Sequence, residues 1–135
     1  MREIDAAKAA LAEPGVVCAL AKNGRTETSG KAGIRPILDW LAEPDDPLCG
    51  AVVADKVVGR AAALLFIHAG VKRLFAAVIS EGAAVLLDSY GISYAFEQMV
   101  PVIINRAGNG QCPMEIKTAG IASPAEAYRL LRTMV

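Results

Sequence analysis

Apolar and polar residues alternate along this chain in short blocks that predict helices and strands in turn. Apolar residues that recur every three or four positions indicate helices, and short continuous apolar runs bounded by glycine or proline indicate buried strands. Asn23-Gly24 is a strong hairpin signal, and it lies between an apolar run and the polar, Thr-containing segment 25–28, which fits a return strand at a sheet edge. The predicted helices span residues 2–12, 34–41, 57–69, 82–90 and 128–134, and the predicted strands span residues 16–21, 25–28, 48–54, 72–79 and 92–96. Ser123-Pro124-Ala125-Glu126 is the start signal of the last helix, with an N-cap, a proline at the first helical position and a glutamate three residues after the cap.

This order of elements predicts an α/β protein with three layers, α/β/α, around a mixed five-stranded sheet. Strands that alternate with helices imply parallel pairing through right-handed crossovers, and the N-terminal hairpin adds an antiparallel edge. The length of 135 residues fits one domain, residues 1–135, with a single core. Asp55 precedes the apolar segment 57–69 and is expected to cap that helix.

Composition and charge exclude several classes of partner. Hydrophobic residues make up 54% of the chain and charged residues 21%, as in a globular protein rather than a disordered one. Fourteen basic and fourteen acidic side chains cancel, so no long-range field attracts nucleic acid or an anionic membrane. The charged N-terminus lacks the apolar core of a signal peptide, and no apolar run reaches membrane-spanning length. We therefore expect a cytoplasmic protein.

The three cysteines fit neither a disulfide framework nor a C-x-x-C pair. Cys18 and Cys49 lie beside apolar residues and are expected to be buried. Cys112 precedes Pro113 and stands three residues before Glu115, as the N-cap of a helix does. A helix N-terminus with Arg106 nearby favours a thiolate, which makes Cys112 a candidate nucleophile or redox-sensitive thiol. A half-buried cap is the alternative.

Several polar residues follow the predicted strands, at the edge where open α/β sheets bind ligands. They are Lys31, Asp55, Lys56, Ser80 and Glu81, and the C-terminal tail is expected to return Asn105, Arg106 and Cys112 to the same edge. Helix N-termini with free N–H groups, together with Lys31, Lys56 and Arg60, favour an anion such as phosphate or carboxylate. Ordinary capping and solvation explain any one of these residues taken alone.

Four short motifs resemble a family of uncharacterised prokaryotic proteins known only as a domain of unknown function. They are Ala54-Asp55-Lys56-Val57-Val58-Gly59, Ser80-Glu81, Asn105-Arg106 and Cys112-Pro113-Met114-Glu115. The resemblance covers almost the whole chain, and that family is assigned to the cytidine deaminase-like fold. It therefore implies a deaminase-like scaffold with a hairpin before the first crossover helix, and it brings no established activity.

The zinc-binding motifs of deaminases have no counterpart in this chain. Zinc-dependent deaminases carry H-x-E and P-C-x-x-C at the starts of two consecutive helices. The matching positions by topology are residues 31–33 and 55–60, and neither segment contains a zinc ligand pair. The single histidine, His68, lies on an apolar helix and is expected in the core or at the helix C-terminus. A catalytic zinc needs three protein ligands, so we expect no metal and no cofactor.

Two main hypotheses of function follow. The first is a small-molecule binding protein or non-zinc enzyme for a nucleotide-like or phosphorylated, anionic ligand. Its ligand-binding residues are Lys31, Lys56, Ser80, Asn105 and Arg106, and its catalytic candidates are Asp55, Glu81 and Cys112. The second is a non-catalytic module, derived from a deaminase scaffold, that forms a homodimer or binds another protein. A zinc deaminase with displaced ligands is a third and weaker alternative.

Overall fold

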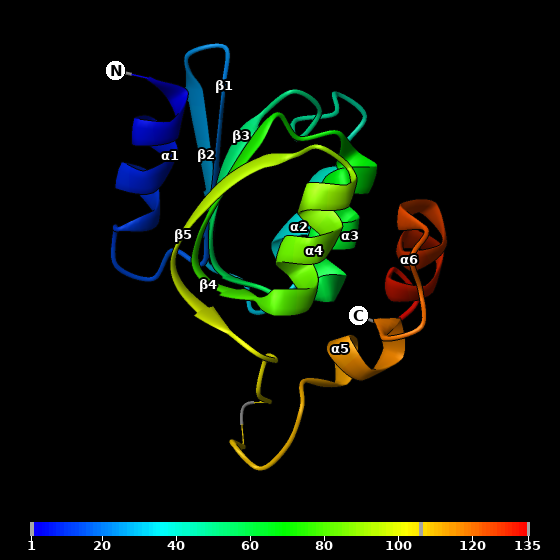
Figure 1. Cartoon of the computed structure of the whole chain (residues 1–135). Coiled ribbons are helices and arrows are strands. Elements are labelled where there is room, and N and C mark those ends of the chain that lie inside the picture. The colour runs from blue at the N-terminus through cyan, green and yellow to red at the C-terminus, as the bar shows by residue number, and fades with distance from the viewer. Residues whose placement is uncertain (1, 106, 135) are drawn as a thin grey trace.

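The computed structural model describes residues 2–105 and 107–134, and within them the chain forms eleven helices and strands (Figure 1). In chain order these are α1 (Glu3–Leu11), β1 (Cys18–Lys22), β2 (Arg25–Ser29), α2 (Arg35–Leu41), β3 (Val52–Val58), α3 (Arg60–Ala69), β4 (Arg73–Ser80), α4 (Glu81–Ser89), β5 (Ser93–Val100), α5 (Pro113–Thr118) and α6 (Pro124–Leu131).

The five strands form one mixed sheet in the order β2-β1-β3-β4-β5. β1 pairs antiparallel with both β2 and β3, whereas β3, β4 and β5 are parallel. The hairpin turn lies at Asn23-Gly24, where both residues have positive φ, as a two-residue hairpin loop requires. The prediction of an α/β protein with a mixed five-stranded sheet and an N-terminal antiparallel hairpin is therefore confirmed.

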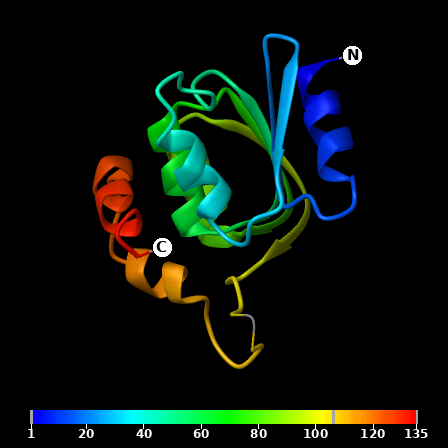
Figure 2. The same ribbon diagram turned by 180° about the vertical axis from the view of Figure 1, so that it is seen from behind.

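Helices cover the two faces of the sheet unequally (Figures 1 and 2). α1 packs alone on one face, where Ile4, Ala7 and Leu11 meet residues of β1, β3 and β4. The larger core lies on the other face, beneath α2, α3 and α4. α3 is the central helix of that core, with Phe66 fully buried, and α6 packs against its outer side.

The boundary between β3 and α3 differs from the prediction. The strand continues to Val58, and α3 begins at Arg60, three residues later than expected. Asp55 is consequently not the cap of α3, because it lies inside β3 in register with Cys18 of β1 and Ala76 of β4. The branched valines of β3 favour an extended chain, and they pair with β4 until Gly59 ends the strand.

Two further expectations concern burial and the membrane. Cys18 is buried as predicted, whereas Cys49 is exposed, because it lies in the loop before β3 rather than in a strand. Across residues 2–105 and 107–134, no helix has the length and apolar character needed to cross a membrane.

Candidate functional site

A cleft of about 670 Å³ opens beside the carboxyl-terminal half of β3. Its walls come from the chain before β1, the segment before α2, β3, the loop after β5 and the start of α5. The lining residues are Val17, Ala32, Gly33, Ile34, Asp55, Lys56, Val57, Ile104, Asn105, Ala107, Cys112, Pro113 and Met114. Most of these side chains are apolar, so the polar groups are few and their positions decide the chemistry.

Asp55 is the buried polar group of the cleft, with only 2% of its surface exposed. Burial raises the pKa of its carboxyl from 3.8 to about 7, because a charged carboxylate is poorly solvated there. Hydrogen bonds from the backbone N–H groups of Val57 and Lys56 favour the carboxylate and lower the pKa only in part. Asp55 therefore exchanges a proton near neutral pH, as a general acid or base does.

Cys18 lies beside Asp55 on the neighbouring strand, in register with it across the antiparallel β1 and β3 pair. Burial raises the pKa of the Cys18 thiol well above its ordinary value, and the negative charge of Asp55 raises it further. The protonated thiol is a hydrogen-bond partner of the Asp55 carboxyl. Cys18 is therefore a neutral supporting group rather than a nucleophile.

Lys56 and Cys112 are the other chemically active side chains of the cleft. Lys56 is exposed and supplies a positive charge to the lining. Cys112 is half-buried at the N-cap position of α5, as predicted, but its side chain makes no capping hydrogen bond. Asn105 also lines the cleft, and its side chain is hydrogen-bonded to Asn109 within the loop.

The other predicted site residues lie outside the lining of this cleft. Lys31 is exposed and forms an ion pair with Asp39, 2.7 Å between Nζ and Oδ2, although its neighbours Ala32 and Gly33 do line the cleft. Ser80 is a buried N-cap of α4 that accepts a hydrogen bond from the Ala83 N–H, and Glu81 is exposed in the first turn of the same helix. Arg106 falls outside the described residues.

The N-terminus of α3 is not open to an external anion, contrary to expectation. Both oxygens of the Glu115 carboxylate accept hydrogen bonds there, at 2.7 Å from the Arg60 N–H and 2.9 Å from the Ala61 N–H. The Arg60 side chain is likewise engaged, because it donates to the carbonyl oxygens of Thr118 and Ile121. Internal groups therefore replace the anion that Arg60 and the helix N-terminus were expected to bind.

The side chains do not fit a catalytic zinc. Within the described part of the chain, no group of three or more histidine, cysteine and carboxylate side chains is arranged to hold a metal ion. His68 is exposed in the last turn of α3 and stacks on Tyr128, with ring centroids 4.8 Å apart. Cys18, Cys49 and Cys112 lie in the sheet, in a loop and at the cleft respectively.

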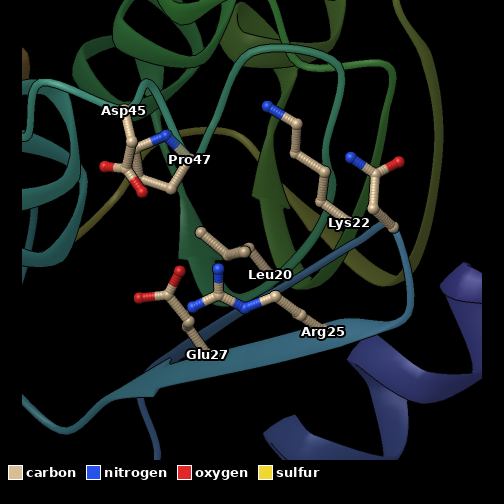
Figure 3. Close-up of a pocket in the computed structure, with 7 residues that line it drawn as sticks. Leu20, Lys22, Arg25, Glu27, Asp45 and Pro47 are labelled. Carbon is tan, nitrogen blue, oxygen red and sulfur yellow. The ribbon is translucent and has the colours of Figure 1, made fainter.

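A second, smaller hollow of about 190 Å³ lies between the β1–β2 hairpin and the loop before β3 (Figure 3). Charged side chains dominate it, including Lys22, Arg25, Glu27 and Asp45, with Leu20 beneath them. Lys22 donates from Nζ to the backbone carbonyl of Asp46. None of the sequence-predicted site residues lines this hollow.

A comparison with protein families matches residues 6–135 to the family described as TM1506, domain of unknown function (DUF1893). The chain belongs to this family. Among solved structures, the DUF1893 chain is similar to a crystal structure of a DUF1893 family protein (TM1506) from Thermotoga maritima. The two share 25% identity and a TM-score of 0.88, over 98% of this chain and 90% of the other. A search of curated proteins finds no match.

Glu115, which follows the cleft residues Cys112, Pro113 and Met114 in this DUF1893 chain, has a role that the sequence did not reveal. Its motif, Cys112-Pro113-Met114-Glu115, indicates a local capping arrangement, in which a glutamate at the third helical position serves its own helix. In the structure the carboxylate is instead bound to α3, more than fifty residues earlier in the chain. Local spacing carries no information about such a long-range contact.

Proposed function

We propose that this protein binds a small organic molecule in the cleft beside Asp55, and that the Asp55 carboxyl exchanges a hydrogen bond or a proton with it. The observation that carries this proposal is a buried carboxyl with a pKa of about 7 in the lining of a cleft of about 670 Å³. Burial of a carboxyl lowers the stability of the folded protein unless the group is hydrogen-bonded. Carboxyls with strongly shifted pKa values are common at functional sites.

The proposed ligand is nucleotide-like, with a flat apolar part and an anionic part such as phosphate. Val57, Ile104 and Met114 offer apolar surface for the first part. Lys56 offers a positive charge for the second. Because Asp55 is neutral when protonated, it can donate a hydrogen bond to the ligand without repelling the anionic group.

We further propose a deaminase-like scaffold that uses non-zinc chemistry. The element order supports the scaffold, since a hairpin precedes the first crossover helix and the segment directly before α2 lines the cleft. In a catalytic role Asp55 is the acid or base, and Cys112, which lines the same cleft, is the candidate nucleophile. Glu81 stays outside this proposal because it lies away from the cleft lining.

A thermal-shift screen tests the proposal with nucleosides, nucleotides and sugar phosphates at millimolar concentration. A ligand present at a hundred times its Kd stabilises the folded protein by roughly 2.7 kcal/mol, which raises the Tm by several degrees. Ala32→Trp should fill the cleft and remove the shift, and Asp55→Asn should weaken it. Glu27→Gln, in the second hollow, should leave the shift unchanged. The absence of any shift with all three ligand classes would contradict the proposal.

The exposed apolar residues of β5 favour a second candidate, a non-catalytic module that dimerises or binds a protein. β5 is an edge strand, and Phe96 and Met99 are 42% and 41% exposed. Edge strands with exposed apolar side chains are sites of strand pairing with another chain. Analytical ultracentrifugation tests this candidate: a dimer that Phe96→Ser converts to a monomer would support it, and a wild-type monomer would count against self-association.

A further inference from the structure

Glu115 makes a long-range contact that joins α5 to α3. It belongs to the short helix α5, is 4% exposed, and its two carboxylate oxygens accept from the first two N–H groups of α3. Those N–H groups have no partner within their own helix, and a carboxylate at this position also interacts favourably with the helix dipole. The carboxylate therefore performs the capping of α3 that no neighbouring residue performs.

Gly59 leaves room for the Glu115 carboxylate because it has no side chain. A Cβ at Gly59 would lie 2.4 to 2.7 Å from the three carboxyl atoms of Glu115, closer than atoms can approach. The φ of Gly59 is −100°, which any residue adopts, so the need for glycine here is steric. The absence of a side chain at residue 59 leaves the space that the carboxylate fills.

The same contact sets the position of one wall of the cleft. Cys112, Pro113 and Met114 line the cleft and directly precede Glu115 in the chain. The Arg60 side chain adds two hydrogen bonds to carbonyl oxygens at and beyond the end of α5. α5 is only six residues long, so its own helical hydrogen bonds contribute little to its stability. Its attachment to α3 therefore contributes to the placement of the wall, beside the hydrogen bond from the Cys112 N–H to the Ile103 carbonyl and the packing of Met114 on the core.

We infer that Glu115 is the positioning residue of the cleft: by capping α3 it holds the Cys112–Met114 wall in place and controls how far the cleft opens. Glu115 itself lies outside the cleft lining and acts through the three residues before it. The position of the wall does not depend on what the cleft binds. The effect of Glu115 on access of a ligand to Asp55 does rest on the proposed function.

The chain offers a matched control residue for this test. Glu126 stands three residues after the N-cap Ser123, with Pro124 at the first helical position, just as Glu115 follows Cys112 and Pro113. Glu126 is exposed, and α6 is capped by the Ser123 side chain. Loss of the Glu126 carboxylate therefore removes the same charge at the same helical position, without a contact to α3.

The alkylation rates of individual cysteines, measured by mass spectrometry with iodoacetamide in the Cys49→Ser background, report the position of the wall. Glu115→Gln should raise the rate at Cys112 by about tenfold, because charge-assisted hydrogen bonds to α3 are lost and local opening becomes easier. Cys18, which is fully buried in the sheet, should keep its slow rate. Glu115→Asp should recover part of the protection, and Glu126→Gln should match the parent protein.

Two further measurements cover the case in which Glu115→Gln fails to fold. In the wild-type chain, the amides of Arg60 and Ala61 should exchange slowly with solvent, because both donate to Glu115. Gly59→Ala should displace the carboxylate and speed alkylation of Cys112, whereas Gly120→Ala should not, because a Cβ at residue 120 meets nothing within 4 Å.

The outcomes separate this inference from the proposed function. An unchanged Cys112 rate in Glu115→Gln, equal acceleration of Cys112 and Cys18, or fast exchange of the Ala61 amide would overturn it, whatever the cleft binds. Selective acceleration of Cys112 together with no ligand in any screen would leave the wall assignment standing and remove the proposed function alone.

Discussion

Asp55 is the buried carboxyl of the cleft, and its raised pKa depends on several parts of the chain. β1 contributes the neighbouring Cys18 thiol, β3 contributes backbone N–H groups, and the remaining cleft walls include residues of the tail. The sequence predicts that Asp55 caps a helix, whereas the structure places it within β3 and in the lining of the cleft. Its burial depends on pairing with β1 and β4, which are far away in sequence.

The buried Asp55 carboxyl predicts a specific dependence of stability on pH. Its pKa is about 7 in the folded protein against 3.8 ordinarily, so between these values the folded state holds a proton that the unfolded chain has released. Stability is therefore lost as pH rises through this window, by up to about 4 kcal/mol, and the loss is complete above it. Asp55→Asn removes the titration.

Urea unfolding of both proteins from about pH 4 to about pH 8 measures this effect. The advantage of Asp55→Asn over the wild type should grow with pH and level off above pH 7. A difference between the two proteins that stays constant over the whole range would show that Asp55 ionises with its ordinary pKa.

At the scale of secondary-structure elements, local sequence predicts the start of one helix and fails to predict the start of another. Ser123-Pro124 predicts the start of α6, and the structure shows the Ser123 side chain accepting from the Glu126 N–H. Gly59 and Arg60 carry no such pattern, so the local sequence predicts the start of α3 too early and does not indicate its cap, Glu115. The cap that lies nearby in sequence was predictable, and the one supplied by another element was not.

Substitution of Ser80 distinguishes two roles for this residue, capping of α4 and binding of a ligand. It is buried and accepts from the Ala83 N–H at 3.1 Å, so Ser80→Ala should lower the free energy of unfolding by about 1 kcal/mol. The affinity for any ligand found in the screen should not change, because Ser80 does not line the cleft. A variant of normal stability with weakened ligand binding would assign Ser80 to the site instead.

At the scale of the whole molecule, β3 and the tail after β5 bring together part of the predicted set. Asp55, Lys56, Asn105 and Cys112 line one cleft, whereas Lys31 pairs with Asp39 and Ser80 caps α4. The alternation of strands and helices was enough to predict the mixed five-stranded sheet. The path of the tail after β5, which completes the cleft, depends on long-range contacts from α5 to α3 that periodicity does not encode.

The central claim is that this cleft is the ligand site, and mapping ligand binding on amide NMR spectra of the wild-type protein tests it most directly. With a ligand from the screen, the largest shift changes should fall on Val17, Gly33, Lys56 and Val57, which line the cleft. The amides of Arg25 and Glu27 in the second hollow should stay unchanged. Changes confined to the second hollow or to β5, or none with any nucleoside, nucleotide or sugar phosphate, would contradict the claim.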